Sequence, residues 1–286
     1  MRAMKKKKVK EPDELKNPLN KMMPNYGVYV FSATEGLAVS IGSFIIGGLV
    51  GMVFYSGLFK DAYGNATAAT QIANAVFFTA LGIVAMRFLT PVYRKSRLSK
   101  QKKKLEQQFL AMLDSLAASY ASGSNTQKAF QSAYTDLQVQ YGEGDYIIRE
   151  IRQILDAMGQ NIGIDVILKD FASRSRNENI VNFAEVFYTC FSKGGNMQTT
   201  VISTYNSIRE KILIEDEIQT KLTSNKMQLN VMSVMPIGIV AMLRATNPSF
   251  AEAFATLIGV IANTAAIGIF IGAYKFGQKI ISLGAE

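Results

Sequence analysis

The stretch GLAVSIGSFIIGGLVGMVFYSGLF, residues 36–59, contains no charged residue over 24 positions. As an α-helix rising about 1.5 Å per residue it spans roughly 36 Å, which exceeds the roughly 30 Å of a bilayer hydrocarbon core. The stretch therefore predicts a transmembrane helix. Because 35 residues precede it and no small-residue cleavage site follows it, we expect a retained anchor and not a cleaved export signal.

Three further uncharged runs predict additional spans. Residues 62–86 form the second run, and residues 253–274 form another that Lys275 closes. Between them, residues 227–243 reach only about 25 Å as a helix and contain Pro236, which places this run at the lower limit for crossing a bilayer. The sequence therefore predicts four spans.

Lysine and arginine are distributed unevenly around these spans. Residues 1–35 carry 8 of them and residues 94–226 carry 18, whereas the two short loops carry only Lys60 and Arg244. The positive-inside rule then places both termini and the central segment in the cytoplasm. An even number of spans requires the same arrangement, so we expect a multi-pass protein of the plasma (inner) membrane.

The central segment has the charge content of a soluble domain, since residues 105–226 hold 11 Lys and Arg against 15 Asp and Glu. Apolar residues return there every three or four positions, as in amphipathic helices, and no strand alternation is present. We therefore predict an all-α polytopic membrane protein with four transmembrane helices and one cytoplasmic six-helix bundle domain. The predicted parts are a basic cytoplasmic segment at 1–35, two spans at 36–93, the cytoplasmic helical domain at 94–226, and two spans with a short basic tail at 227–286.

Polar and glycine-containing corners separate the predicted helices. The first helix of the domain is expected to end at Gly123, and Ser124 with Gln127 has the spacing of a capping box that opens the second. Asp145 is the expected N-cap of the third helix, and residues 173–177 form a polar break before the fifth.

The stretch FSKGGNMQTTV, residues 191–201, predicts the corner before the sixth helix. Gly194 or Gly195 can take the left-handed conformation that closes the fifth helix, and Asn196 can accept backbone N–H bonds at the start of the sixth. A phosphate-binding loop would need a preceding strand and a following lysine, which this stretch lacks, so we interpret it as a structural corner. Nothing in residues 197–234 breaks a helix, so we expect the sixth helix to continue into the third span.

Composition argues against enzymatic chemistry. The chain has no histidine and a single cysteine, Cys190, which removes the commonest general base and any thiolate cluster. Cys190 lies among aromatic residues, so we interpret it as a small buried hydrophobe in preference to a reactive thiol. No acidic residue, histidine or cysteine lies within a predicted span, which argues against an intramembrane enzyme. We expect no catalytic residue, metal or cofactor.

Two charged stretches are candidate contact sites. Residues 94–104, RKSRLSKQKKK, carry seven positive charges, and anionic lipid attracts such a run by about 1 kcal/mol per basic residue. A protein docking site is the alternative, whereas nucleic acid is not expected because no aromatic residues interleave with the charges. The acidic turn at 215–217 is either a solvated helix face or a partner contact. The candidate lipid or partner contacts are Arg94, Lys95, Arg97, Lys102, Lys103, Lys104, Glu215, Asp216 and Glu217.

Two small-xxx-small motifs occur within the spans, GGLVG at 47–51 and GIFIG at 268–272. Such spacing allows helices to approach closely, either within the chain or with a partner. The alternative is that glycine is simply frequent in membrane helices.

The order of three motifs resembles a known family. GGNMQTTVISTYNSIREK (194–211), ASGSNTQKAF (121–130) and PIGIVAMLRATNPSF (236–250) are similar to recurrent corners and a membrane hairpin of the type II secretion system F-domain (GspF/PilC-like) family. These are the inner-membrane platform proteins of type IV pilus, type II secretion and tight-adherence (Tad, or Flp) pilus machines. One cytoplasmic domain between two pairs of spans resembles the TadB and TadC members, and the likeness covers about residues 105–275.

The resemblance implies an assembly platform without enzymatic activity. Its implied partners are a cytoplasmic secretion ATPase, pilin subunits, and homologous platform chains in a homo- or hetero-oligomer. The chain departs from the family at Ser124, Asn125 and Thr126, and it is unusually polar at Gln228 and Asn230. The alternative is a transporter or channel subunit, but ionisable groups mark such routes and the spans contain only Arg87, near a membrane face.

Overall fold

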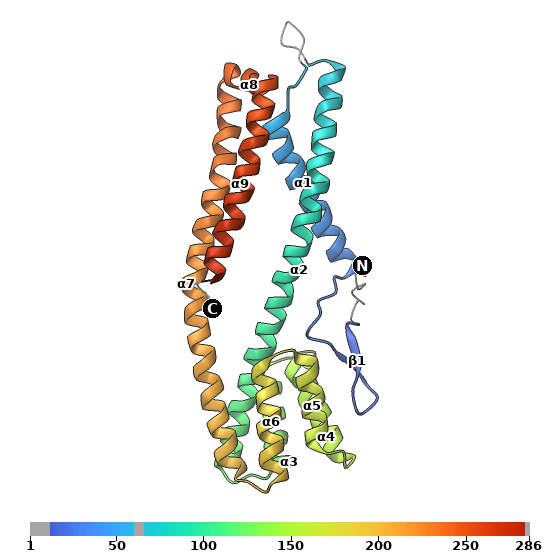
Figure 1. The fold of residues 1–286 in the computed structure, drawn as a ribbon. Helices are drawn as coiled ribbons and strands as arrows, with labels where there is room; N and C mark the ends of the chain where they lie inside the picture. The colour runs from blue at the N-terminus through green and yellow to red at the C-terminus, as the bar shows by residue number, and fades with distance from the viewer. Residues whose placement is uncertain (1–11, 60–65, 284–286) are drawn as a thin grey trace, which may run out of the picture. The chain divides into compact units, whose positions relative to one another are not determined.

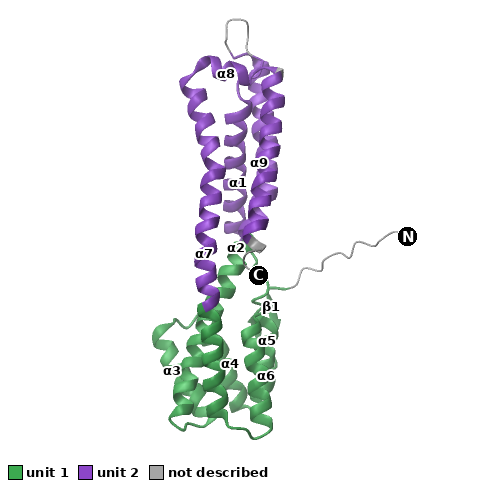
Figure 2. Cartoon of the chain, turned by 60° about the vertical axis from the view of Figure 1, so that its left-hand side comes forward, with its two compact units in different colours: residues 1–30, 94–213 green, residues 31–93, 214–286 purple. Residues whose placement is uncertain are grey.

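The computed structural model describes residues 12–59 and 66–283. The chain divides into two compact units, which Figure 2 colours separately: unit 1 comprises residues 1–30 and 94–213, and unit 2 comprises residues 31–93 and 214–286. The described residues contain nine helices, α1 to α9, and two strands of three residues each (Figure 1). The predicted all-α fold class is confirmed.

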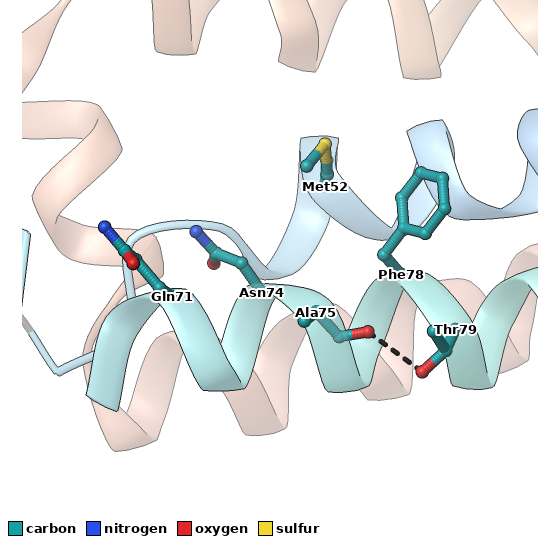
Figure 3. Close-up of a pocket in the computed structure, with 6 residues that line it drawn as sticks. All are labelled: Met52, Gln71, Asn74, Ala75, Phe78 and Thr79. Atoms are coloured by element: carbon teal, nitrogen blue, oxygen red, sulfur yellow. Dashed lines mark hydrogen bonds between the residues drawn. The ribbon is translucent and has the colours of Figure 1, made fainter. Parts of the chain in front are cut away.

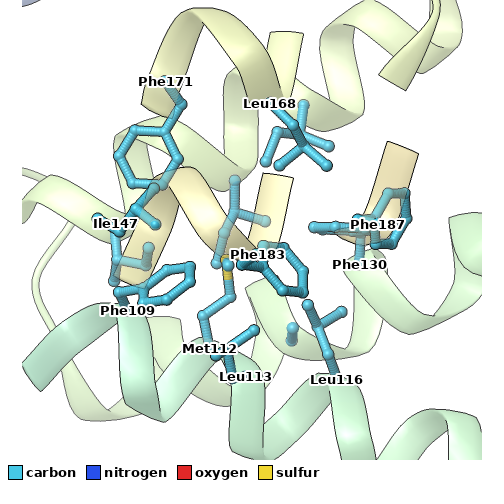
Figure 4. Packing of buried hydrophobic residues seen from close by; sticks show 14 of the residues in the cluster. Phe109, Met112, Leu113, Leu116, Phe130, Ile147, Leu168, Phe171, Phe183 and Phe187 are labelled. Carbon is cyan, nitrogen blue, oxygen red and sulfur yellow. The ribbon is translucent and has the colours of Figure 1, made fainter. Parts of the chain in front are cut away.

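Unit 1 is built around one apolar core to which every helix contributes a face. Phe109 and Phe183 meet edge to face in its middle with ring centroids 5.6 Å apart, and Phe130 meets Phe187 in the same manner at 6.1 Å (Figure 4). The apolar residues of each helix recur every three or four positions, which places them on one face. The helices are the C-terminal part of α2 (Ala68–Ala121), α3 (Thr126–Gln140), α4 (Tyr146–Gly159), α5 (Ile164–Ser175), α6 (Glu178–Ser192) and the N-terminal part of α7 (Met197–Thr246).

The N-terminal part of unit 1 contains a short hairpin that the sequence analysis did not predict. Strand β1 (Glu14–Lys16) pairs antiparallel with β2 (Met22–Pro24). Asn17 organises the turn between them, because its Oδ1 accepts the backbone N–H groups of Leu19 at 3.0 Å and Lys21 at 2.8 Å. Each strand has only three residues, so the alternation of apolar and polar side chains is too short to recognise in the sequence.

Unit 2 contains α1 (Ala33–Tyr55), the N-terminal part of α2, the C-terminal part of α7, the short α8 (Pro248–Phe254) and α9 (Leu257–Leu283). Four helices of the described chain, α1, α2, α7 and α9, are long and apolar enough to cross a membrane. Their large apolar side chains point outward: Ile83 is 60% exposed and Ile269 is 72% exposed. Lipid is the environment in which such a surface is stable.

Glycines allow α1 and α2 to pack closely within unit 2. A Cβ added at Gly82 would lie 2.7 Å from the Phe44 ring, and one added at Gly51 would lie 3.1 Å from the Phe77 carbonyl oxygen. Gly47 is equally crowded, by Ala85 of α2. The motif at 47–51 therefore serves packing inside the chain, one of the two interpretations left open by the sequence.

Two helices run without interruption from one unit into the other along the chain. Helix α7 contains both the sixth predicted domain helix and the third span, as expected, and continues through Pro236. Helix α2 does the same for the second span and the first domain helix, and it continues through Pro91. The continuity of α2 was not predicted, because the basic run at 94–104 was interpreted as a separate surface segment.

Three predicted boundaries were wrong, two of them in unit 1 and one in unit 2. Helix α3 is capped by Asn125 and not by Ser124 with Gln127. Helix α5 continues to Ser175, so the predicted break at 173–177 shrinks to two residues, because both Arg174 and Ser175 are buried in the unit.

The fourth span begins later than predicted. Asn247 accepts the backbone N–H of Phe250 at 3.2 Å and, with Pro248 at the first helical position, starts the separate helix α8. The hydroxyl of Thr256 then accepts the N–H of Gly259 at 3.0 Å, near the start of α9. The uncharged run at 253–274 thus contains a helix break that charge counting does not reveal.

Candidate functional site

The two glycine corners of unit 1 have the same construction. Gly123 and Gly194 both adopt the left-handed conformation, with φ of 79° and 68°. In each corner the N–H of the next residue donates to the carbonyl oxygen five residues earlier, over 3.1 Å after Gly123 and 2.8 Å after Gly194. This is the hydrogen bond that closes a helix at a left-handed glycine. Figures 1 and 2 show both corners at the same end of unit 1.

An asparagine then opens the following helix in both corners. Asn125 accepts the N–H of Lys128 at 2.9 Å, and Asn196 accepts the N–H of Thr199 at 3.1 Å, as predicted for Asn196. Gly195 has a separate reason to be glycine, since an added Cβ would lie 2.9 Å from the Cys190 sulfur. The closing hydrogen bonds and the asparagine caps account for the glycine and asparagine of each corner, which supports the structural interpretation of the corners.

The predicted basic run is partly used inside unit 1. The Arg94 Nε donates to the Tyr29 carbonyl oxygen at 2.8 Å, and the Lys102 amine donates to the Arg176 carbonyl oxygen at 3.4 Å. Lys104 pairs with Asp145 at 2.5 Å. Asp145 is at the predicted N-cap position of α4, but its carboxylate makes no capping hydrogen bond there. The side chains of Lys95, Arg97, Lys100 and Lys103 in the same run are exposed.

The Lys104–Asp145 pair shifts both titrations toward the charged forms. The hydrogen bond between the Lys104 amine and the Asp145 carboxylate raises the pKa of Lys104 and lowers the pKa of the Asp145 carboxyl. The Lys104 amine also lies 5.5 Å from the centre of the Tyr146 ring. The C-terminal end of the basic run therefore ties α2 to the start of α4.

The predicted acidic turn lies on α7 beyond the end of unit 1. Glu217 forms an ion pair with Lys221 at 2.9 Å, one helical turn later, which lowers the pKa of the Glu217 carboxyl. Both side chains are largely exposed. The neighbouring Leu213 and Ile214 are also exposed.

The most elaborate polar site of unit 1 was missed by the sequence analysis. Arg174 of α5 donates to both carboxylate oxygens of Glu150 of α4 at 2.7 Å, and its Nε donates to Asp170 at 2.8 Å. The side chains of Arg174 and Glu150 are 1% and 2% exposed. A buried ion pair is stable only when further hydrogen bonds complete it, and the bidentate geometry does so here.

A tyrosine from the N-terminal segment completes this buried pair. The Tyr26 hydroxyl donates to the Glu150 Oε1 at 2.8 Å, and the Tyr26 backbone N–H donates to the Arg174 carbonyl oxygen at 3.0 Å. Burial and the adjacent Glu150 carboxylate raise the pKa of Tyr26 well above its usual value, so the hydroxyl remains a donor. Burial by itself lowers the pKa of Arg174, but the Glu150 and Asp170 carboxylates outweigh it and the net shift is upward.

One signal in the sequence could have revealed this site. Glu150 lies three residues after Ile147 and Arg174 lies three residues after Phe171, so both charges occupy core-facing positions of their helices. Opposite charges on the apolar faces of neighbouring helices predict a buried pair. Nothing comparable marks Tyr26, because its segment has no long periodic pattern.

Unit 2 has its own polar site, at the C-terminal end of α1. The Arg244 guanidinium donates to the carbonyl oxygens of Val53 and Ser56, and the Asn263 side chain donates to the Phe54 carbonyl oxygen at 3.3 Å. The last carbonyl groups of a helix have no partner within it. Side chains from α7 and α9 supply those partners, and they also tie both helices to α1.

Two shallow cavities lie on the helices of unit 2. One, of about 380 Å³, is lined by α1 and α2 and contains the amides of Gln71 and Asn74 beside Met52 and Phe78 (Figure 3). The other, of about 430 Å³, lies on α7 around Asn230 and Met235. Among the residues that the structure describes, no ionisable side chain lines either cavity. These cavities offer apolar surface and a few amides, but no group for acid–base chemistry at neutral pH.

Within the described ranges no three His, Cys, Asp or Glu side chains are grouped so that they could hold a metal ion. Comparison with known proteins adds no assignment: no family model, no curated protein and no solved structure matches the chain. The candidate sites are therefore the corners, the buried pair with Tyr26, and the polar end of α1.

Proposed function

We propose that the chain is an inner-membrane assembly platform of a Tad or type IV-like pilus or a type II secretion machine. In this proposal unit 1 is a cytoplasmic six-helix bundle that a secretion ATPase moves, and the four spans transmit this movement to pilin subunits in the bilayer. Homologous platform chains and anionic lipid complete the assembly. The motif resemblance and the distribution of positive charge support this orientation, with both termini and unit 1 in the cytoplasm.

One observation carries the proposal. Helices α2 and α7 each combine a membrane-length apolar segment with residues of the unit 1 core, such as Phe109 and Val201, without a break in the helix. A continuous helix transmits displacement and rotation along its axis better than a flexible linker does. Two such helices make unit 1 a lever for the membrane segments.

A deletion can test the ATPase contact while the two long helices remain. Residues 122–196, which contain α3 to α6, would be replaced by a short Gly-Ser linker that joins the end of α2 to the start of α7. We expect the full chain to co-purify from native membranes with a secretion ATPase and the deletion variant to lose it. Retained ATPase in the deletion variant would contradict docking on unit 1.

A second comparison tests the acidic turn on α7. Replacing Glu215, Asp216 and Glu217 together by Gln removes three negative charges from an exposed helix face. If the turn is an ATPase contact, co-purification falls at least fivefold, whereas Glu143→Gln, a change at a surface carboxylate elsewhere, leaves it unchanged. Equal recovery of ATPase by both variants would identify the turn as a solvated face.

A membrane transporter or channel subunit is the alternative function, and one observation favours it. The amides of Gln71 and Asn74 line a cavity between apolar helices, where polar side chains in membranes commonly mark a substrate route. Solute or ion flux into liposomes that contain the purified chain alone would support this alternative. Absence of flux, together with ATPase co-purification, supports the platform.

A further inference from the structure

Residues 12–30, the N-terminal strap, lie on the helices of unit 1, and three of its side chains contact α4. Asn17 donates to Gln153 at 3.1 Å, Lys21 donates to Asp156 at 2.7 Å, and Tyr26 donates to Glu150. Glu150, Gln153 and Asp156 follow one another at intervals of three residues, so they line one side of α4. The strap therefore docks along one face of α4.

Tyr26 is the anchor of the strap. Its ring is fully buried and meets Tyr146 and Phe171 edge to face, with centroids 5.2 Å and 6.4 Å away. Met23 is the strap's other fully enclosed large apolar side chain, whereas Lys21 is about half exposed. Docking thus depends on two large apolar side chains and a few hydrogen bonds, which is a small apolar area for a segment of this length.

The buried pair does not need the strap. When the strap is absent, Glu150 keeps both hydrogen bonds from Arg174, and Arg174 keeps its bond to Asp170 and loses only the Pro24 carbonyl oxygen at 3.3 Å. Undocking would therefore leave no isolated buried charge, which is the feature that makes removal of one partner of a buried pair so costly. A segment with this property can leave and return while the helices beneath it remain folded.

The far end of the strap leads directly into the first span. Arg94 of α2 holds the Tyr29 carbonyl oxygen at 2.8 Å, and in unit 2 the Phe31 ring stacks on Tyr93 of the same helix with centroids 6.1 Å apart. Helix α1 begins at Ala33, seven residues after Tyr26. Seven residues extend to at most about 25 Å, so a docked Tyr26 restricts the start of α1 to that reach.

We propose that the N-terminal strap is a latch with two states, in which Tyr26 docked against Glu150 and Arg174 restrains the start of α1 and undocking releases it. The strap is a third covalent connection between unit 1 and the spans besides α2 and α7, and the docking of Tyr26 makes its restraint on α1 reversible. The inference requires only that α1 enters a membrane, so it does not depend on the identity of the machine.

The full chain in lipid nanodiscs provides the test, by hydrogen exchange and thiol labelling. Tyr26→Ala is expected to speed amide exchange of residues 22–28 at least tenfold, while exchange in α4 and α5 changes less than threefold. In a Cys190→Ser background, labelling of Ser32→Cys by a soluble maleimide is expected to rise at least threefold with Tyr26→Ala. Tyr134→Ala, which removes a half-buried tyrosine of α3, is the matched control and should leave residues 22–28 and position 32 unchanged.

Three other outcomes overturn the latch. If Tyr26→Ala speeds exchange of α4 and α5 as much as that of the strap, the segment is an integral part of the core. If residues 22–28 exchange at the same rate in both proteins, Tyr26 is not the anchor. If the strap exchanges faster but labelling at position 32 is unchanged, the strap docks without restraining α1. Tyr26→Phe, which keeps the ring and loses only the hydroxyl, should give an intermediate increase in strap exchange, and no increase would assign anchoring to the ring alone and exclude the hydrogen bond to Glu150.

Discussion

Units 1 and 2 use similar apolar side chains in opposite ways. In unit 1, Phe109 and Phe183 are fully enclosed, whereas in unit 2 Phe276 is 67% exposed and Ile269 is 72% exposed. Unit 1 therefore has the interior of a protein that folds in water, and unit 2 has a surface that is stable only against lipid. The difference teaches that one chain carries two kinds of apolar surface, and that the change from one to the other occurs within the unbroken helices α2 and α7.

The largest expected contrast is between a buried and a lipid-facing phenylalanine. Phe109→Ala should lower the free energy of unfolding of unit 1 by about 3–5 kcal/mol, because it leaves a cavity in the core. Phe276→Ala, the same change on the exposed face of α9, should cost less than about 1 kcal/mol in a bilayer, since lipid replaces the ring. Hydrogen exchange of each unit in nanodiscs measures both, and equal losses would remove the distinction between the units.

The second contrast concerns the two polar sites. Glu150→Ala should destabilise unit 1 by about 3 kcal/mol, because the buried Arg174 loses its bidentate partner and keeps only Asp170 and the Pro24 carbonyl oxygen. Arg244→Gln should cost unit 2 only about 1–2 kcal/mol, because it leaves neutral carbonyl groups at the end of α1. Chemical unfolding in detergent would give the two values. If Arg244→Gln lowered the free energy of unfolding more than Glu150→Ala, the polar site of unit 2 would contribute more to stability than that of unit 1.

A third contrast lies within unit 2, between its two glycine motifs. Gly47 faces Ala85 closely, while nothing lies within 4 Å of a Cβ added at Gly268. Gly47→Val should therefore destabilise the packing of α1 on α2 by about 1–3 kcal/mol through overpacking. Gly268→Val should have no effect on the isolated chain. Thermal unfolding in detergent checks the pair, and a clear loss for Gly268→Val would indicate that a second chain occupies this face under those conditions.

The smallest expected effect is the pH dependence of the Lys104–Asp145 pair. The pKa of Asp145 is lowered in the folded chain, so its contribution is present above the unfolded pKa of about 4 and is lost as pH falls through the lower folded value. The pKa of Lys104 is raised, so its contribution is present below about pH 10 and is lost as pH rises through the higher folded value.

Because the Lys104 side chain is 54% exposed, the pair contributes only about 0.5 kcal/mol. Asp145→Asn should remove that contribution at pH 7 and leave the stability unchanged below pH 3, as measured by urea unfolding at both values. A loss of similar size at pH 3 would mean that packing or helix capping, and not charge, is responsible.

Sequence alone predicted the helical class, the four apolar segments and the corner at Gly194 and Asn196, because each depends on local patterns. Long uncharged runs, apolar spacing and a left-handed glycine followed by asparagine are all determined within about one or two helical turns of chain. The continuity of α7 was predicted for the same reason, since it required only the absence of a breaker.

The missed features depend on contacts between distant segments. Tyr26 meets Glu150 across 124 positions, and Arg244 meets Val53 across 191. The break before α9 was missed because an uncharged run conceals polar capping by Thr256. The basic run was interpreted as one exposed surface. In the structure, Arg94 at one end donates to the Tyr29 carbonyl oxygen and Lys104 at the other end pairs with Asp145. A count of charges does not reveal such contacts.

The central claim is that unit 1 folds in the cytoplasm and continues into membrane spans through α2 and α7. Its most direct test is labelling of single cysteines in intact cells with a membrane-impermeant maleimide, in a Cys190→Ser background. Val139→Cys replaces a side chain of unit 1 that is 89% exposed, and Ser249→Cys lies in the loop helix α8. The account predicts that position 249 is labelled in intact cells and that position 139 is labelled only after lysis. Labelling of position 139 in intact cells would contradict it.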